Sequence, residues 1–214
     1  MSTLFIETLD QKRKTAFEKL AQFSPDFVLA GGTAIMLQLN HRLSYDFDCF
    51  SQKPIKKTLR RKAVEIFGED IKVNIDNSDI LQFITPEGVE VTFVFNPYPP
   101  LHPLVKTGSI PLFNLTDLAT DKARTIGRRG AWRDYVDLFF FLKWKVYSLE
   151  QIIKESEKRF KAGEFHDKLF LGQLTYYDDL EIVPVTFLQD KYSPGEIQKF
   201  LRDEVKKQMS AIIT

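Results

Sequence analysis

The sequence contains very little cysteine, since Cys49 is the only one in 214 residues. A single cysteine excludes an intrachain disulfide and fits a reducing cytoplasm, where we expect the protein to act. It also excludes a zinc site built from cysteines. The three histidines, His41, His102 and His166, follow no spacing typical of a metal site or a catalytic triad. We therefore interpret them as structural or solvent-facing residues.

The sequence also lacks an excess of either charge and any long apolar run. Lys and Arg total 30 and Asp and Glu total 29, so the net charge is +1 and no overall basicity indicates nucleic acid. No stretch of 18 apolar residues is present, and the first ten residues do not resemble a signal peptide. The 43% hydrophobic content is ordinary for a globular protein of one or two domains.

What the sequence does contain is a patterned segment from Phe27 to Ser51. It begins with a short apolar run typical of a strand and continues through Gly31-Gly32 into an apolar helical pattern led by Thr33. Glycines in front of a helix offer backbone N–H groups and the positive end of the helix dipole, and both suit phosphate. The segment therefore predicts a phosphate-binding turn between a strand and a helix.

The same segment ends in an alternating stretch that carries two carboxylates. Alternation puts Asp46 and Asp48 on one face of a strand and Phe47 and Cys49 on the other. Neighbouring carboxylates repel each other, and a divalent cation is the usual charge between them. A phosphate-binding turn beside such carboxylates is typical of phosphoryl or nucleotidyl transfer. Because Cys49 lies on the opposite face, we interpret it as a core residue rather than a nucleophile.

The rest of the pattern predicts an α+β protein. Helical periodicity covers residues 3–22 and 55–67, three strands are expected between residues 71 and 95, and five helical segments follow from residue 114 onward. Four of the ten prolines lie between residues 96 and 103, which we interpret as a linker. We therefore expect an α/β head over residues 1–103 and a mainly helical part over residues 104–214.

One predicted helix has a strongly basic exposed face. The six cationic residues in and just before the helix expected over residues 55–67 are Lys53, Lys56, Lys57, Arg60, Arg61 and Lys62. A solvated helix face is the plainer interpretation. The alternative is a surface that contacts the phosphates of a polynucleotide.

Two blocks of the sequence resemble a known family. Gly31-Gly32, thirteen further residues and then Asp46-Phe47-Asp48 resemble the first motif of polymerase-β-like nucleotidyltransferases. The longer text GGTAIMLQLNHRLSYDFDCF is similar to the AbiEii/AbiGii toxin family of these enzymes. A second block, DLATDKARTIGRRGAWRDYVDLFFFL, resembles the family's Lys-bearing helix followed by an Arg-Asp-x-x-Asp-Leu helix. The resemblance covers about residues 27–142 and implies a small mixed nucleotidyltransferase sheet, with a helical C-terminal half that completes the nucleotide site.

The resemblance also implies roles for individual residues. Asp46 and Asp48 would hold one or two Mg²⁺ (or Mn²⁺) ions that bridge an NTP and the attacking hydroxyl. Backbone at the glycine pair would approach the phosphates, and Lys122 would offset charge on the triphosphate. The other residues implied in nucleotide binding or catalysis are Thr33, Arg42, Ser44, Arg133, Asp134 and Asp137. Of these, Arg42 and Ser44 would contact phosphate or brace the Asp strand.

A third metal-binding carboxylate is left open by the sequence. Many enzymes of this fold carry it on a later strand, which here is the stretch from Gly88 to Phe93. Alternation puts Glu90 and Thr92 on the face opposite the phenylalanine. If Glu90 occupies the position, the metal site has three carboxylates; if Thr92 does, the third ligand is missing.

Three functions of the protein are compatible with these observations. The first is a Mg²⁺-dependent enzyme that moves an NMP to the hydroxyl of an RNA, such as a tRNA 3′ end, or of a protein; the resemblance implies a toxin of a bacterial toxin–antitoxin or phage-defence pair. The second is a degenerate relative that binds nucleotide or a partner without turnover. A third is nucleotidylation of a small molecule such as an aminoglycoside, which would require an acidic acceptor cleft.

Overall fold

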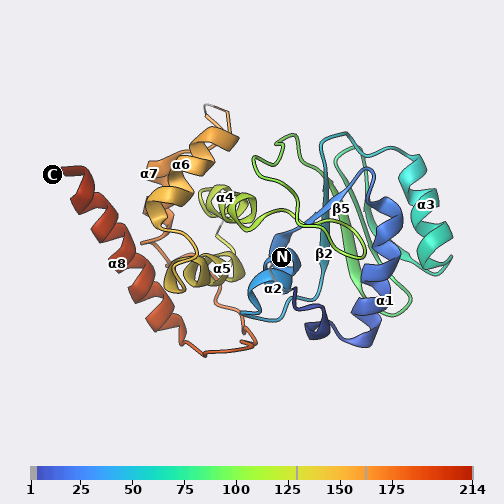
Figure 1. Cartoon of the computed structure of the whole chain (residues 1–214), viewed down its shortest axis with the longest axis horizontal. Coiled ribbons are helices and arrows are strands. Elements are labelled where there is room, and N and C mark those ends of the chain that lie inside the picture. Colours follow the sequence, from blue (N-terminus) through green and yellow to red (C-terminus); the bar gives the residue numbers. More distant parts are fainter. Residues whose placement is uncertain (1–3, 129, 162, 214) are drawn as a thin grey trace. The chain divides into compact units, whose positions relative to one another are not determined.

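The computed structural model describes residues 4–128, 130–161 and 163–213 (Figure 1). The chain divides into two compact units, Met1–Asn114 and Leu115–Thr214. This boundary lies later than the one expected after residue 103, because the segment beyond the prolines pairs with the first unit. Leu112 forms bridges with both Leu29 and Val105. Within the described ranges, no helix has the length and apolar character needed to cross a bilayer.

The first unit is built on a mixed five-stranded sheet with the strand order β1-β2-β5-β4-β3, which confirms the predicted α+β class. The strands are β1 (Val28–Ala30), β2 (Phe47–Ser51), β3 (Lys72–Asp76), β4 (Ile80–Ile84) and β5 (Glu90–Phe95). The pair β2–β5 is parallel, and every other neighbouring pair is antiparallel. The parallel pair lies inside the sheet, so Asp48 of β2 has a strand on either side.

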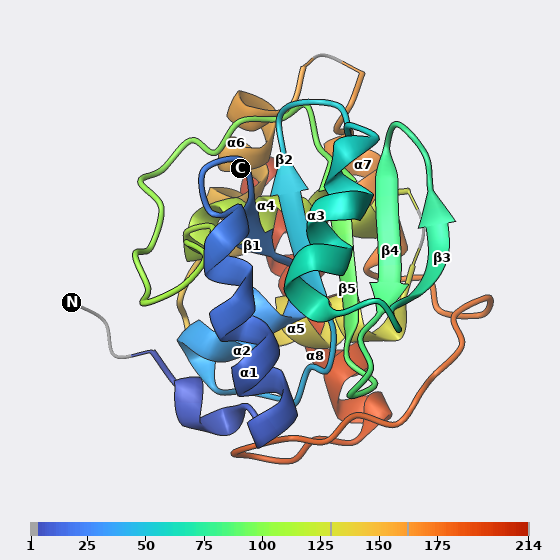
Figure 2. The same ribbon diagram turned by 90° about the vertical axis from the view of Figure 1, so that its right-hand side faces the viewer.

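Helices cover both faces of this sheet. α1 (Gln11–Leu20) and α3 (Thr58–Phe67) lie in front of the strands in Figure 2, and α2 (Gly31–Leu39) lies behind them. The face toward α1 and α3 carries the aromatic core, in which the Phe47 ring of β2 stacks on Phe17 of α1 with centroids 6.1 Å apart. The Phe93 ring of β5 lies 4.7 Å from that of Phe23. Alternation therefore leaves Asp48 of β2 on the α2 face.

The N-terminal helices are shorter than the sequence predicted. Residues 3–22 were expected to form one helix, but the chain forms a 3₁₀ turn at Ile6–Thr8, then α1, then a second 3₁₀ turn, η2, at Ala21–Phe23. The Asp10 carboxylate accepts a hydrogen bond from the backbone N–H of Arg13 at 3.0 Å and so fixes the beginning of α1. α3 likewise begins at Thr58 rather than at residue 55.

The second unit is helical, as expected. Its helices are α4 (Leu115–Ile126), α5 (Trp132–Lys143), α6 (Leu149–Arg159), α7 (Asp167–Gln173) and α8 (Pro194–Ile213). The apolar run in α5 is buried on every side, as expected for a helix in the interior of the fold. α6 begins with a capping box in which the side chain of Ser148 accepts from the N–H of Gln151 and the Gln151 side chain accepts in return.

Candidate active site

Two glycines at the beginning of α2 allow polar side chains to come unusually close to the helix. Gly31 has φ of +65°, where L side chains are strained, and a Cβ added there would lie 2.3 Å from Asp48 Oδ2. A Cβ on Gly32 would lie 2.8 Å from Arg42 Nη2 and 2.9 Å from Ser44 Oγ. The predicted phosphate-binding turn therefore has a carboxylate, a guanidinium and a hydroxyl against its backbone.

The two carboxylates of the Asp-x-Asp motif lie beside this turn. Asp48 is in β2, whereas Asp46 directly precedes the strand, which begins one residue later than the alternation suggested. The Ser44 hydroxyl donates to Asp46 Oδ1 at 3.3 Å, and the Thr33 hydroxyl donates to the backbone carbonyl of Asp46. Contacts within the first unit thus hold Gly31, Asp46 and Asp48 together.

Thr33 and Arg42 are almost completely buried. Thr33 is 1% exposed and Arg42 is 3% exposed. The Thr33 hydroxyl donates to the backbone carbonyl of Asp46, and Arg42 Nη1 donates to the carbonyl of Leu43 at 3.0 Å. In this structure both residues brace the segment that leads into the Asp-x-Asp motif.

The strand neighbour of Asp48 is Thr92. The parallel register pairs these two residues, and Glu90 lies two residues earlier on the same face of β5. The Gln82 side chain donates to Glu90 Oε1 at 3.0 Å and lies 3.4 Å from Thr92 Oγ1. Among the residues that the structure describes, no three His, Cys, Asp or Glu side chains are grouped so that they could share a metal ion.

This arrangement fits a divalent cation held by two carboxylates. Mg²⁺ usually keeps several water or phosphate oxygens and takes only one or two carboxylates from the protein. The Asp48 carboxylate lies next to the position that a side chain of residue 31 would occupy, at the positive end of α2. Asp46 and Asp48 therefore provide a donor set suited to a hard cation that also binds phosphate.

Cys49 lies on the opposite face of β2, as its parity predicted. It is fully buried, and its register partners are Leu29 and Phe93. Burial, and secondarily the charge of Asp48, raises the pKa of the Cys49 thiol well above its usual value. Cys49 is therefore a protonated core residue.

The second unit contains a buried cluster that was also singled out from the sequence. Lys122 Nζ of α4 lies 2.7 Å from Asp134 Oδ1 and 2.8 Å from Asp137 Oδ2, both on α5. The Asp137 side chain is fully buried, while that of Asp134 is 12% exposed. Two aspartates one helical turn apart thus hold one ammonium group between them. Arg133, on another side of α5, is exposed and lies outside this cluster.

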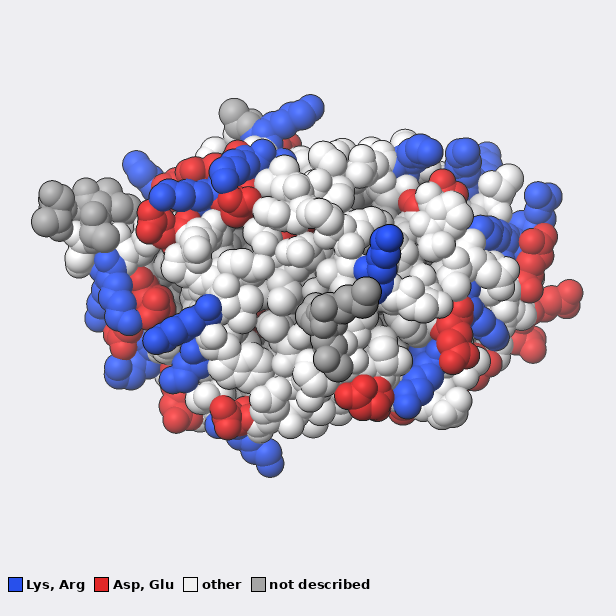
Figure 3. Space-filling view, viewed as in Figure 1, with Lys and Arg blue, Asp and Glu red and all other residues white. Residues whose placement is uncertain are grey.

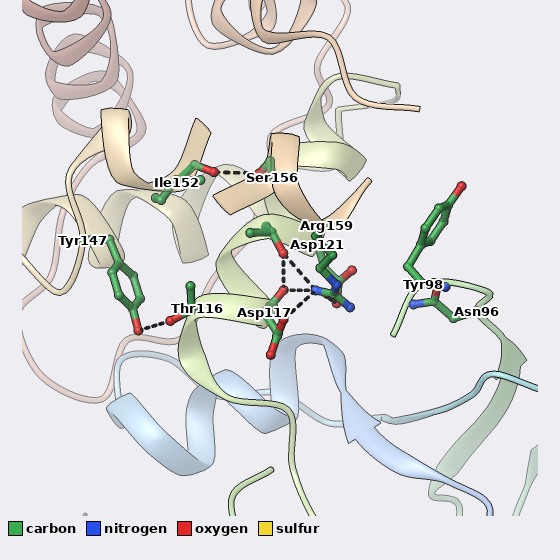
Figure 4. Close-up of polar contacts among 10 residues, drawn as sticks. Asn96, Tyr98, Thr116, Asp117, Asp121, Tyr147, Ile152, Ser156 and Arg159 are labelled. Carbon is green, nitrogen blue, oxygen red and sulfur yellow. Dashed lines mark hydrogen bonds and ion pairs between the residues drawn. The ribbon is translucent and has the colours of Figure 1, made fainter. Parts of the chain in front are cut away.

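A second buried network in this unit was missed from the sequence. The fully buried Arg159 of α6 donates to Thr120 Oγ1 at 2.8 Å and lies 3.3 Å from Asp121 Oδ2 and 3.7 Å from Asp117 Oδ1 (Figure 4). Burial raises the pKa of Asp121 to about 6, although the charge of Arg159 opposes the shift and that of Asp117 adds to it. The spacing of Asp117, Thr120 and Asp121 marks a polar stripe on α4, but nothing in the sequence assigns Arg159 to it.

Comparison with known proteins first shows the fold, which two solved structures share. A TM-score of 0.64 relates the chain to MenT4, nucleotidyltransferase toxin Rv2826c from Mycobacterium tuberculosis H37Rv, at 13% identity over 91% of this chain and 80% of that one. JHP933 from Helicobacter pylori gives a TM-score of 0.50 at 15% identity, covering 95% and 97% of the two chains.

The family follows from the sequence comparison. Residues 16–211 match the model described as "Nucleotidyl transferase AbiEii toxin, Type IV TA system". The chain therefore belongs to the AbiEii toxin family, as the sequence motifs indicated, and is a nucleotidyltransferase. Protein aq_aa25 of Aquifex aeolicus (strain VF5) is 26% identical over 205 residues, which are 93% of this chain and 97% of that protein.

Proposed function

We propose that the protein is a Mg²⁺-dependent toxin that transfers an NMP from an NTP to a hydroxyl group of an RNA, such as a tRNA 3′ end, or of a protein. One observation carries the proposal: Asp48 Oδ2 lies so close to the beginning of α2 that only glycine fits at position 31. A carboxylate held at a phosphate-binding helix end suits a metal shared with a triphosphate.

The proposed reaction assigns roles to the first unit. Asp46 and Asp48 would hold the metal, which would offset negative charge on the phosphates and favour ionisation of the acceptor hydroxyl. The N–H groups at the beginning of α2 bind phosphate oxygens. The acceptor oxygen bonds to the α-phosphorus, the bond from that phosphorus to pyrophosphate breaks, and the hydroxyl proton passes to water. Glu90 assists the metal if Gln82 releases it, and Ser44 keeps Asp46 in place.

Roles for residues of the second unit are also part of the proposal. Lys122 would bind a nucleotide phosphate, with its ammonium group anchored by the fully buried Asp137 and released by the less buried Asp134. Asp134 is proposed as a catalytic residue, and the exposed Arg133 is proposed as a nucleotide contact. In the cell, we expect the enzyme to act in the cytoplasm, controlled by an antitoxin, in a toxin–antitoxin or phage-defence system.

The test is incubation of the purified protein with total bacterial RNA, Mg²⁺ and each α-³²P-labelled NTP in turn. Asp48→Ala is the inactive variant, and Asp70→Ala removes an exposed carboxylate of the same unit as the matched control. Label in RNA that disappears only in Asp48→Ala supports RNA as the acceptor. Label in polypeptide under the same control supports a protein acceptor. Equal labelling by wild type and Asp48→Ala would refute the assigned site.

A second candidate is a family member that binds nucleotide without turnover. The observation in its favour is that the strand neighbour of Asp48 is the hydroxyl of Thr92 rather than a carboxylate. This alternative predicts measurable NTP binding with no incorporation of any of the four labels. Replacing the neighbour with a carboxylate, Thr92→Asp, would then be expected to create or increase transfer.

A further inference from the structure

One hollow in the first unit lies away from the proposed active site. It has a volume of about 590 Å³ and is formed by η2, the end of β2 and α3. Ser51 lines it at the end of β2, whereas Asp48 lies near the beginning of that strand and Asp46 directly precedes it. Three residues of a strand span about 10 Å, so the hollow is a site separate from the two carboxylates.

The hollow combines an apolar floor with a cationic rim. The floor is formed by buried side chains, among them Phe23, Phe27, Ile55 and Leu59. Four cations on the rim outnumber two acids; these six residues are Lys53, Lys56, Arg61, Lys62, Asp26 and Glu65. The local charge is therefore positive although that of the whole chain is only +1. Such a site favours a ligand with an apolar ring and a negative charge.

The rim cations differ in their contacts with other protein groups. Arg61 lies 3.7 Å from Glu65, and Lys62 Nζ donates to the carbonyl of Gln22 at 2.6 Å. Both groups therefore have protein partners within or beside the hollow. Lys53 and Lys56 are exposed as Arg61 is, but their ammonium groups form no ion pair or side-chain hydrogen bond within the part of the chain that the structure describes. Their ammonium groups are the ones placed to meet an incoming anion.

The hollow continues into a second one, and the two form a groove. The second hollow has a volume of about 290 Å³ and shares Asp26, Phe27, Ser51 and Lys53 with the first, and Tyr98 is among its other lining residues. On the other side, exposed cations continue at Lys57, just before α3, and at Arg60, which lies 3.3 Å from Asp76. Figure 3 shows Lys and Arg as well as Asp and Glu side chains over the region of α3. We name this feature the Lys53 groove.

We propose that the Lys53 groove is a second nucleotide-binding site, distinct from the transfer site. Bases would lie against the apolar floor and Tyr98, and phosphates would bind Lys53 and Lys56. Proteins that bind single strands combine a positive groove with aromatic side chains in this way. The shared chemistry is a nucleotide, which comes either free or as part of an RNA strand. The inference does not depend on the proposed transfer reaction.

The test measures binding by the full-length protein in EDTA, which removes divalent metal from Asp46 and Asp48. One probe is a fluorescein-labelled oligouridine, and the other is the fluorescent mononucleotide N-methylanthraniloyl-AMP. The variant Lys53→Glu/Lys56→Glu reverses two charges in the groove, and Lys72→Glu/Lys106→Glu reverses two exposed charges elsewhere in the same unit. We expect the groove variant to bind about tenfold or more weakly, and the control to stay within about twofold of wild type.

Two further readouts make the outcome decisive. The groove variant should also show a shallower dependence of affinity on salt, whereas Tyr98→Ala should weaken binding with the salt dependence unchanged. Binding of the oligonucleotide alone would identify a strand as the ligand, and binding of both probes would show that one nucleotide suffices. No binding of either probe to wild type, or equal losses in the groove and control variants, would overturn the proposal. None of these measurements requires catalytic activity.

Discussion

Gly31 is the residue on which the geometry of the proposed transfer site depends most directly. Its positive φ and the 2.3 Å approach of Asp48 Oδ2 to a hypothetical Cβ are two separate reasons for glycine. Gly88 also has a positive φ, of +78°, but no atom lies within 4 Å of the position of its Cβ. A substitution at Gly88 therefore tests backbone strain alone, whereas one at Gly31 tests strain together with a steric clash.

We predict that Gly31→Ala and Gly88→Ala differ in both stability and activity. Each should lose about 1–2 kcal/mol of unfolding free energy from backbone strain. Gly31→Ala should lose about 1–3 kcal/mol more because the methyl group collides with Asp48. Urea unfolding and NTP transfer assays measure the two effects. If Gly88→Ala lost transfer activity as completely as Gly31→Ala, the close approach at Gly31 would not be what matters.

The residues of the Asp-x-Asp motif could be predicted because the signal is local. A glycine pair, a short helix and two alternating carboxylates all fall within 25 residues of the sequence. The actual partners of Thr33 and Arg42 could not be predicted in this way. They depend on how the loop before β2 folds back on α2, and many side-chain arrangements are compatible with the same spacing.

At the scale of helices, α4 and α5 are joined through Lys122. Its ammonium group is shared by a fully buried Asp137 and by Asp134, whose side chain is 12% exposed. Breaking a buried ion pair leaves a charge that water cannot solvate, whereas a partly exposed partner can be replaced by water. The two aspartates should therefore contribute unequally to stability although both are in contact with the same group.

We predict that Asp137→Asn destabilises the protein more than Asp134→Asn. The first should cost about 1–3 kcal/mol of unfolding free energy, because a neutral amide replaces a buried carboxylate beside Lys122. The second should cost less, since water can reach Asp134. Denaturant unfolding of the two full-length variants provides the measurement. A larger loss for Asp134→Asn would show that exposure does not determine the strength of these contacts.

The network around Arg159 makes a prediction about pH. The pKa of Asp121 is raised from 3.8 to about 6, chiefly by burial, so the folded state favours the neutral carboxyl group. Its contribution to stability is therefore complete below pH of about 4 and is lost as pH rises through about 6. The full shift corresponds to roughly 2–3 kcal/mol. Asp121→Asn should flatten this part of the stability–pH curve.

The matched control for this experiment is Asp178→Asn, which changes an exposed carboxylate of the same unit. Its stability should vary with pH in the same way as that of wild type. The measurement is thermal unfolding between pH of about 4 and 7. As the pH rises over this range, wild type should lose more stability than Asp121→Asn does. Identical curves for wild type and Asp121→Asn would mean that the carboxyl group is ionised throughout.

The type of nearly every element could be predicted from periodicity, but the pairing of strands could not. The three strands from β3 to β5 and the five helices from α4 to α8 appear close to where the pattern put them. The parallel pairing of β2 with β5 joins segments more than forty residues apart, and no local pattern specifies it. That pairing decides that Thr92 rather than Glu90 lies beside Asp48.

At the scale of the whole molecule, the charges are balanced but unevenly distributed. A net charge of +1 provides no general attraction for a polynucleotide, so any such attraction must come from local groups. The predicted linker shows that composition alone does not locate the boundary between the two units. Prolines between residues 96 and 103 do mark irregular chain, but the unit ends only at Asn114, because backbone bridges at Leu112 return the chain to the sheet.

The membership of a toxin family leads to a prediction for the living cell. Induced expression of the wild-type protein should slow the growth of a bacterial host, and Asp48→Asn should not. The amide cannot supply the charge of a metal ligand, and a loss of about 3 kcal/mol of transition-state stabilisation already slows transfer more than a hundredfold. Asp70→Asn removes an exposed carboxylate of the same unit and should slow growth as wild type does. Growth curves at matched protein levels, checked by immunoblot, measure the effect. Equal growth inhibition by Asp48→Asn would show that toxicity does not require Asp48.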